Sequence, residues 1–127
     1  MSRRLHLTLL PGRFAVCRFA AAEAVPSLDA GTFVSVTRTE RELSVVCGED
    51  QVPAGARVEK SWACLEVAGP IEFSEVGVVA GISKTLAAAG ISLFVISTFD
   101  TDYILVKQER IDDVVAALEL AGYVIST

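Results

Sequence analysis

The sequence is poor in histidine and positive charge and lacks closely spaced cysteines, and each of these absences argues against a class of function. His6 is the one histidine, and Cys17, Cys47 and Cys64 show no C-x-x-C spacing. Zinc sites need several such ligands at short, regular spacing, so we expect no metal. The three cysteines lie in apolar, strand-like stretches, which predicts buried and reduced thiols.

Basic residues are scarce as well, with 11 Lys and Arg against 16 Asp and Glu. Nucleic acids and anionic membranes both favour a basic surface, so neither is expected as a partner. No stretch approaches the roughly 20 apolar residues of a membrane span. The apolar stretch near the N-terminus, LHLTLLP at residues 5–11, is too short and too interrupted for a signal peptide. We therefore expect a cytoplasmic protein.

The 127 residues, 52% of them hydrophobic, can bury a core of ordinary size. In residues 61–127 the hydrophobic pattern changes from strand to helix and back, and Gly90 and Gly122 stand where helices commonly end. The expected elements are a strand at 61–67, a helix from 78 to 89, strands at 91–98 and 103–107, a helix from 111 to 121 and a strand at 123–125. This βαββαβ order predicts an α+β, ferredoxin-like fold.

The N-terminal half is rich in strand patterns but less regular, and one interpretation is a degenerate copy of the same unit. The expected elements are strands at 5–10, 13–19, 32–37 and 43–47, with a short helix around 23–28. Residues 48–60 have no periodicity and are interpreted as the link between the halves. We therefore expect two domains, at residues 1–60 and 61–127.

Polar groups are expected to meet at one edge of the C-terminal sheet. In a βαββαβ unit the loop before the first helix, GPIEFSEVGV at residues 69–78, and the hairpin turn, Phe99 to Asp102, lie at the same edge. The first N–H groups of the helix can bind a carboxylate. Asp100 and Asp102 offer negative charge to an ammonium or guanidinium group. Such an edge fits a free amino acid.

Two structural interpretations compete with this binding site. Ser74 or Glu75 can simply cap the helix, and Asp residues in turns commonly bond to their own backbone. Catalysis is a weaker alternative, because the one histidine leaves the serines without an activating base, and no G-x-S-x-G, phosphate-loop or dinucleotide motif is present. Asp100 and Asp102 are too close together on a short turn to flank a reacting bond. We expect neither enzyme activity nor a cofactor.

Two stretches carry a resemblance to a known family. EVAGPIEFSEVGVVAGIS at residues 66–83 and AGISLFVISTFDTDYILVK at residues 89–107 closely resemble ACT domains. The group they resemble comprises the aspartokinase-like and CASTOR-type (cytosolic arginine sensor) domains, in a small bacterial stand-alone form. The resemblance covers about residues 60–126, and its most specific part is STFDTDYILV at 97–106. The N-terminal half is similar to a degenerate first ACT unit.

The resemblance implies ACT domains in tandem that bind an amino acid and regulate an unknown downstream protein. It places the ligand contacts in two segments: Ser74, Glu75, Val76, Gly77 and Val78, and Thr98, Phe99, Asp100 and Asp102. Asp102 would then hold the amine or guanidinium of the ligand. The chain is about half as long as the sensors, so the complementary units would come from a second copy in a homodimer.

The resemblance leaves two other classes of function open. A structural or protein-interaction module with a decayed ligand site would have the same fold. An enzyme that uses Asp100 or Asp102 is the third, weaker alternative.

Overall fold

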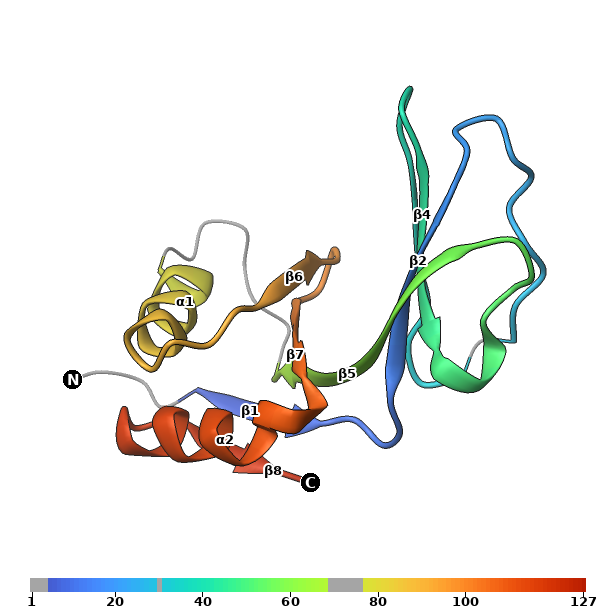
Figure 1. The fold of residues 1–127 in the computed structure, drawn as a ribbon. Helices are drawn as coiled ribbons and strands as arrows, with labels where there is room; N and C mark the ends of the chain where they lie inside the picture. The colour runs from blue at the N-terminus through green and yellow to red at the C-terminus, as the bar shows by residue number, and fades with distance from the viewer. Residues whose placement is uncertain (1–4, 30, 69–76) are drawn as a thin grey trace. The chain divides into compact units, whose positions relative to one another are not determined.

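The computed structural model describes residues 5–29, 31–68 and 77–127, and the chain folds into two compact units (Figure 1). One unit combines residues 1–10 with residues 63–127, and the other comprises residues 11–62. We call the first the ACT unit, after the domains that residues 60–126 resemble, and the second the N-terminal β unit. This division follows a different line from the expected boundary between residues 60 and 61.

The ACT unit contains the βαββαβ order that the sequence predicts. Its elements are β5 (Arg57–Val67, of which 63–67 lie in this unit), α1 (Val78–Ala88), β6 (Phe94–Ser97), β7 (Asp102–Lys107), α2 (Ile111–Leu120) and β8 (Val124–Ser126). A short 3₁₀ turn, η2 (Gln108–Arg110), precedes α2. The predicted strands and helices are thus confirmed within a few residues.

An additional strand from the N-terminus completes the sheet of the ACT unit. β1 (His6–Leu9) pairs antiparallel with β5 and parallel with β8, which gives the strand order β8-β1-β5-β7-β6. The sequence predicted β1 as a strand but assigned it to the N-terminal half. Pairing between strands that are more than 50 residues apart leaves no local signal, since each strand shows only its own alternation.

Both helices pack on one face of this sheet. Alternate residues of the strands, such as Leu65 and Val67 in β5, meet the buried residues of α1 and α2 in one core. The remaining fully buried members include Leu7, Ile82, Leu86, Ile104, Val106, Val114 and Leu118. No helix in the described part of the chain is long and apolar enough to cross a membrane.

Glycine ends both helices, as the sequence predicts. Gly90 follows α1 at a φ of 73°, and Gly122 follows α2 at a φ of 100°. After α2, the N–H of Gly122 donates to the carbonyl of Glu119 at 3.0 Å, and the N–H of Tyr123 donates to that of Leu118 at 3.0 Å. This pair of bonds is a Schellman motif, which satisfies the last carbonyls of the helix.

The N-terminal β unit is built from strands. β2 (Phe14–Phe19), β3 (Ser35–Arg38), β4 (Leu43–Gly48) and the first part of β5 form antiparallel pairs in the order β3-β4-β2-β5, and a 3₁₀ turn, η1 (Glu49–Gln51), follows β4. A separate core of alternate residues includes Cys17, Leu43 and Cys47. The predicted buried thiols are confirmed, since all three cysteines are buried and unpaired by disulfides.

Two expectations for the N-terminal half are wrong. Residues 23–28 form no helix: a turn at 21–22 leads into irregular chain, and the Arg38 guanidinium donates to the carbonyls of Ala21 and Glu23. Residues 48–60 are more than a link, because η1 lies within them and β5 begins at Arg57. The alternating pattern of β5 starts in the charged stretch RVEK, where polar side chains hide it.

Replacement of Gly122 by alanine should lower the free energy of unfolding by about 1 to 2 kcal/mol, the usual cost of a left-handed conformation for a residue with a Cβ. A Cβ at this position would meet no atom within 4 Å, so the loss would come from the backbone alone. Urea denaturation followed by circular dichroism measures it. Ala121→Ser is the control, since Ala121 has an ordinary helical φ of −82°. Equal stability of Gly122→Ala and the parent protein would contradict this account of the helix end.

Candidate functional site

The hairpin turn between β6 and β7 is held closed by its two threonines. The Thr98 N–H donates to the Thr101 carbonyl at 2.8 Å, and the Thr101 N–H donates to the Thr98 hydroxyl at 3.3 Å. The Thr98 hydroxyl also donates to the Thr101 carbonyl at 3.1 Å. Because backbone and side chains are bonded to each other, the turn has a defined shape.

Thr101 also attaches this turn to the end of β5. Its side chain is 8% exposed, and its Oγ1 donates to the carbonyl of Val67 at 2.6 Å. Val67 is the last residue of β5, after which the chain leaves for α1. The turn and the exit of β5 therefore lie at the same edge of the sheet, as the βαββαβ topology predicts.

The two predicted carboxylates occupy different environments at this edge. Asp102 is half-buried, and its Oδ1 accepts a hydrogen bond from Ser97 Oγ at 2.5 Å. Ser97 and Asp102 are directly opposed in the β6–β7 pair, which brings these side chains together. Asp100 is exposed at the tip of the turn, beside Phe99, whose side chain is 80% exposed. One anion is thus fixed and the other lies in solvent.

Gly77 and Val78 lie at the start of α1. Gly77 is the N-cap residue with a φ of 87°, and its carbonyl accepts the N–H of Gly81 at 2.8 Å. Glycine has no side chain to cap a helix, so Gly77 leaves the first amide donors of α1 without that partner. The other three residues predicted for this segment, Ser74, Glu75 and Val76, lie outside the described residues.

A tyrosine–glutamate pair beside the hairpin was not foreseen from the sequence. Tyr103 of β7 donates from its hydroxyl to Glu66 Oε2 of β5 at 2.7 Å. This bond to a carboxylate, together with burial, raises the pKa of Tyr103 to about 12. Thr101 and Ser97 were missed as well, since only the pairing of strands shows what a threonine or serine in a turn contacts. Glu66 and Tyr103 each stand in an alternating strand pattern of the sequence, and this was the available signal for the pair.

No group of three or more His, Cys, Asp or Glu side chains in the described ranges is placed to hold a metal ion. The site therefore consists of carboxylates, hydroxyls and backbone amides. Such an arrangement can bind a small molecule through hydrogen bonds and charge.

Comparison with known proteins agrees with the fold of the ACT unit. The family model of the ACT domain matches residues 57–119, and a model of an N-terminal domain matches residues 12–55. The chain belongs to the ACT-domain proteins. Its mixed α+β architecture is the ferredoxin-like fold of that family.

One curated protein and two solved structures are similar to this chain. The human cytosolic arginine sensor for mTORC1, subunit 1, is 33% identical over 107 residues, which cover 78% of this chain and 32% of that protein. A crystal structure of an Agrobacterium tumefaciens protein is 39% identical with a TM-score of 0.90 and covers 98% of this chain and 93% of that one. The regulatory subunit of Thermus thermophilus aspartate kinase shares the fold at 11% identity, with a TM-score of 0.59 and coverage of 91% and 96%.

The aligned part of this chain spans about a third of the human sensor, a smaller share than the half expected from the resemblance.

Replacement of Thr101 by valine should cost about 1 to 3 kcal/mol of unfolding free energy, because it leaves the Val67 carbonyl without its buried donor. Thr101→Ser keeps the hydroxyl and should lose less. Thermal and urea denaturation of the two variants provide the measurement. If valine and serine proved equally stable, the hydroxyl would not hold the turn.

Tyr103 should ionise far above the ordinary tyrosine pKa of 10, and Glu66→Gln should lower its pKa towards that value. The folded pKa is raised, so the bond contributes stability below pH 10 that is lost as the pH rises to about 12. The absorbance of tyrosinate during alkaline titration measures this. Tyr103→Phe leaves Tyr123 as the remaining tyrosine and isolates the Tyr103 signal. Ionisation of Tyr103 near pH 10 in the parent protein would refute the coupling.

Proposed function

We propose that this protein binds a free amino acid at the edge of its ACT unit and regulates a downstream protein without catalysis of its own. The observation that carries the proposal is the edge itself. A turn that holds Asp100 and Asp102 is bonded to the end of β5 by Thr101, and α1 begins after Gly77, which has no side chain to cap the helix.

An amino acid is the ligand that suits these groups. Its carboxylate would accept bonds from the first amides of α1, where the helix carries partial positive charge. Its ammonium or guanidinium would lie near Asp102 and Asp100. We assign the contacts to Ser74, Glu75, Val76, Gly77 and Val78, and to Thr98, Phe99, Asp100 and Asp102. The hairpin segment supports the assignment most directly, because all of its members are among the described residues.

The relatives support the same class of function. One is described as an arginine sensor and another as the regulatory subunit of an aspartate kinase. As the resemblance to the arginine sensors implies, we further propose that the protein acts as a homodimer. We also propose a cytoplasmic location, which the likeness to a cytosolic sensor and the free, buried cysteines support.

The tandem arrangement of ACT units is a further part of the proposal. Residues 1–60 would be the degenerate first unit and residues 61–127 the second. The strands of the N-terminal β unit support its assignment as such a copy. Its described residues contain no α-helix, so any relation to an ACT unit would lie in its strands.

A protein-interaction module with a decayed ligand site is the second candidate. Two observations favour it: Ser97 already occupies one oxygen of Asp102, and the Phe99 side chain is 80% exposed at the tip of the turn. Exposed aromatic side chains are common anchors in interfaces between proteins. A binding measurement distinguishes the two candidate functions, because only the sensor binds an amino acid.

Calorimetric titration with the standard amino acids should give heat for at least one of them. Asp102→Asn should then weaken binding about tenfold, as expected for the loss of one charged hydrogen bond. Asp112→Asn, an exposed acid in the first turn of α2, is the matched control and should bind like the parent protein. Heat from no amino acid would favour the interaction module. Equal affinity in Asp102→Asn and the parent would remove Asp102 from the site.

A further inference from the structure

The N-terminal β unit contains a pocket of about 570 Å³. Three segments line it: the start of β2 with the loop before it, residues 31–34, and the end of β4 with η1; Lys60 of β5 completes the wall. Pockets of about 300 to 1,000 Å³ commonly hold small molecules. All of its lining residues lie between positions 11 and 62, so the pocket belongs to this unit alone.

Two phenylalanines give the pocket an apolar lining. Phe14 and Phe33 are 2% and 8% exposed, and their rings meet edge to face with centroids 6.2 Å apart and an interplanar angle of 84°. Such pairs hold both rings in fixed orientation. The methylene groups of a ligand could pack against this lining.

Hydrogen bonds to backbone groups hold the polar side chains around the rings. Glu49 Oε2 accepts the N–H of Ser61 at 2.8 Å, and Gln51 Oε1 accepts the N–H of Asp29 at 3.0 Å. The N–H of Glu49 donates to the Arg13 carbonyl at 2.9 Å, which attaches η1 to the start of β2. The Glu49 and Gln51 side chains are thus fixed before any ligand binds, which lowers the cost of binding.

Backbone irregularities shape the same wall. Ser61 has a φ of 67°, rare for a residue with a Cβ, and it lies where the β2–β5 register shifts. The bond from Ser61 to Glu49 stabilises this bulge, and Lys60 beside it lines the pocket. At Gly48 a Cβ would approach Asp50 Oδ1 to 2.8 Å, so the absence of a side chain lets the Asp50 carboxylate fold over the backbone.

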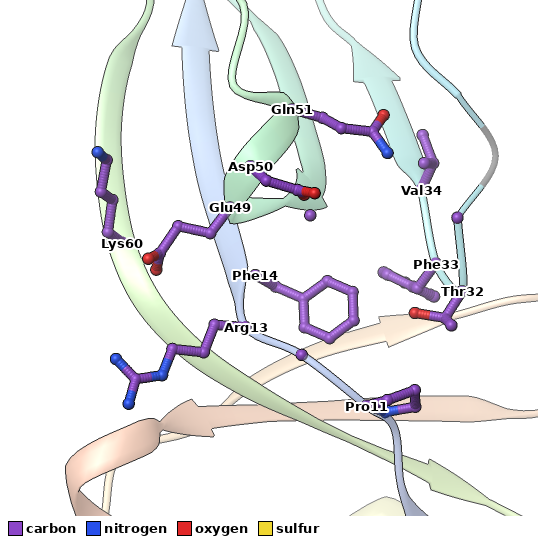
Figure 2. A pocket seen from close by; sticks show the side chains of 13 residues that line it. Pro11, Arg13, Phe14, Thr32, Phe33, Val34, Glu49, Asp50, Gln51 and Lys60 are labelled. Carbon is purple, nitrogen blue, oxygen red and sulfur yellow. The ribbon is translucent and has the colours of Figure 1, made fainter.

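The charges are divided between the two sides of the Phe14 ring. Figure 2 shows Arg13 and Lys60 on one side with the Glu49 carboxylate between them, and Asp50, Gln51 and Thr32 on the other. Arg13 and Lys60 together outweigh Glu49, which leaves one side net positive. Asp50 is the charged side chain on the other side, which is therefore net negative.

We propose that this pocket binds a small dipolar molecule whose carboxylate and ammonium groups are separated by an aliphatic stem. The carboxylate lies at Arg13 and Lys60, the ammonium at Asp50, and the stem against Phe14 and Phe33. A molecule with one charge would satisfy one side and leave the other without a counter-charge. The proposal does not depend on the ligand site at the edge of the ACT unit.

Nuclear magnetic resonance of the ¹⁵N-labelled full chain tests the proposal with 6-aminohexanoate as the probe. The amides of Gly12, Gly31 and Gly48 lie in the pocket and should shift on addition of the probe. Gly77 reports on the edge of the ACT unit and should not shift with them. Hexanoate and hexylammonium carry one charge each and should bind about tenfold more weakly.

Two pairs of variants assign the charges. Arg13→Gln and Asp50→Asn should each weaken binding of 6-aminohexanoate about tenfold. The controls Arg57→Gln and Glu40→Gln remove exposed charges outside the lining and should bind like the parent protein. The replaced side chains are exposed, and unchanged resonances elsewhere would show that each variant is folded.

Three results would overturn the proposal. The first is the absence of shifts at Gly12, Gly31 and Gly48. The second is hexanoate or hexylammonium binding as tightly as 6-aminohexanoate, which would show that one side of the pocket is unused. The third is equal weakening in Arg13→Gln and Arg57→Gln, or in Asp50→Asn and Glu40→Gln, which would indicate a general effect of net charge.

Discussion

The hydrogen bond from Thr101 to the Val67 carbonyl determines how the candidate site is built. It joins the tip of one hairpin to the last residue of the strand that leads to α1. A buried hydroxyl and a buried carbonyl both lose free energy if they are left unpaired, so the bond is retained in the folded state. Thr101 therefore positions the polar groups of the hairpin turn, although Thr101 itself need not touch a ligand.

The two carboxylates beside this bond differ in environment because only one of them belongs to a strand pair. Asp102 lies opposite Ser97 in the β6–β7 pair and accepts a hydrogen bond from its hydroxyl. Asp100 is two residues away in the turn and is exposed to solvent. The first can provide a charge in a fixed position, and the second can adjust to what approaches. A binding edge with one fixed and one adaptable anion suits a ligand that carries positive charge.

Much of the ACT unit was predictable because its signals are local. Gly90 and Gly122 mark helix ends through their own backbone preferences, and the short acidic segment between two β-rich runs marks the hairpin. The resemblance of residues 97–106 to ACT domains added the family. The placement of β1 between β5 and β8 was not predictable, since it depends on which strands pair over long sequence distances.

The N-terminal β unit shows the same limit more clearly. Its strands were expected from alternation, but the charged stretch at 57–60 hid the first part of β5, and the helix expected at 23–28 gave way to a turn whose carbonyls bind Arg38. The pocket was not expected at all. It is assembled from residues 11–14, residues 31–34, residues 48–51 and Lys60, and no single stretch of sequence contains more than a part of it.

The most direct test of amino acid binding at the ACT edge follows the backbone amides of the full chain during titration with amino acids. The account predicts that one ligand shifts the resonances of Thr98 to Asp102 and those of Gly77 to Ala80 together, with the same midpoint. Shifts in one segment alone, or in neither with any amino acid, would contradict a site formed by both.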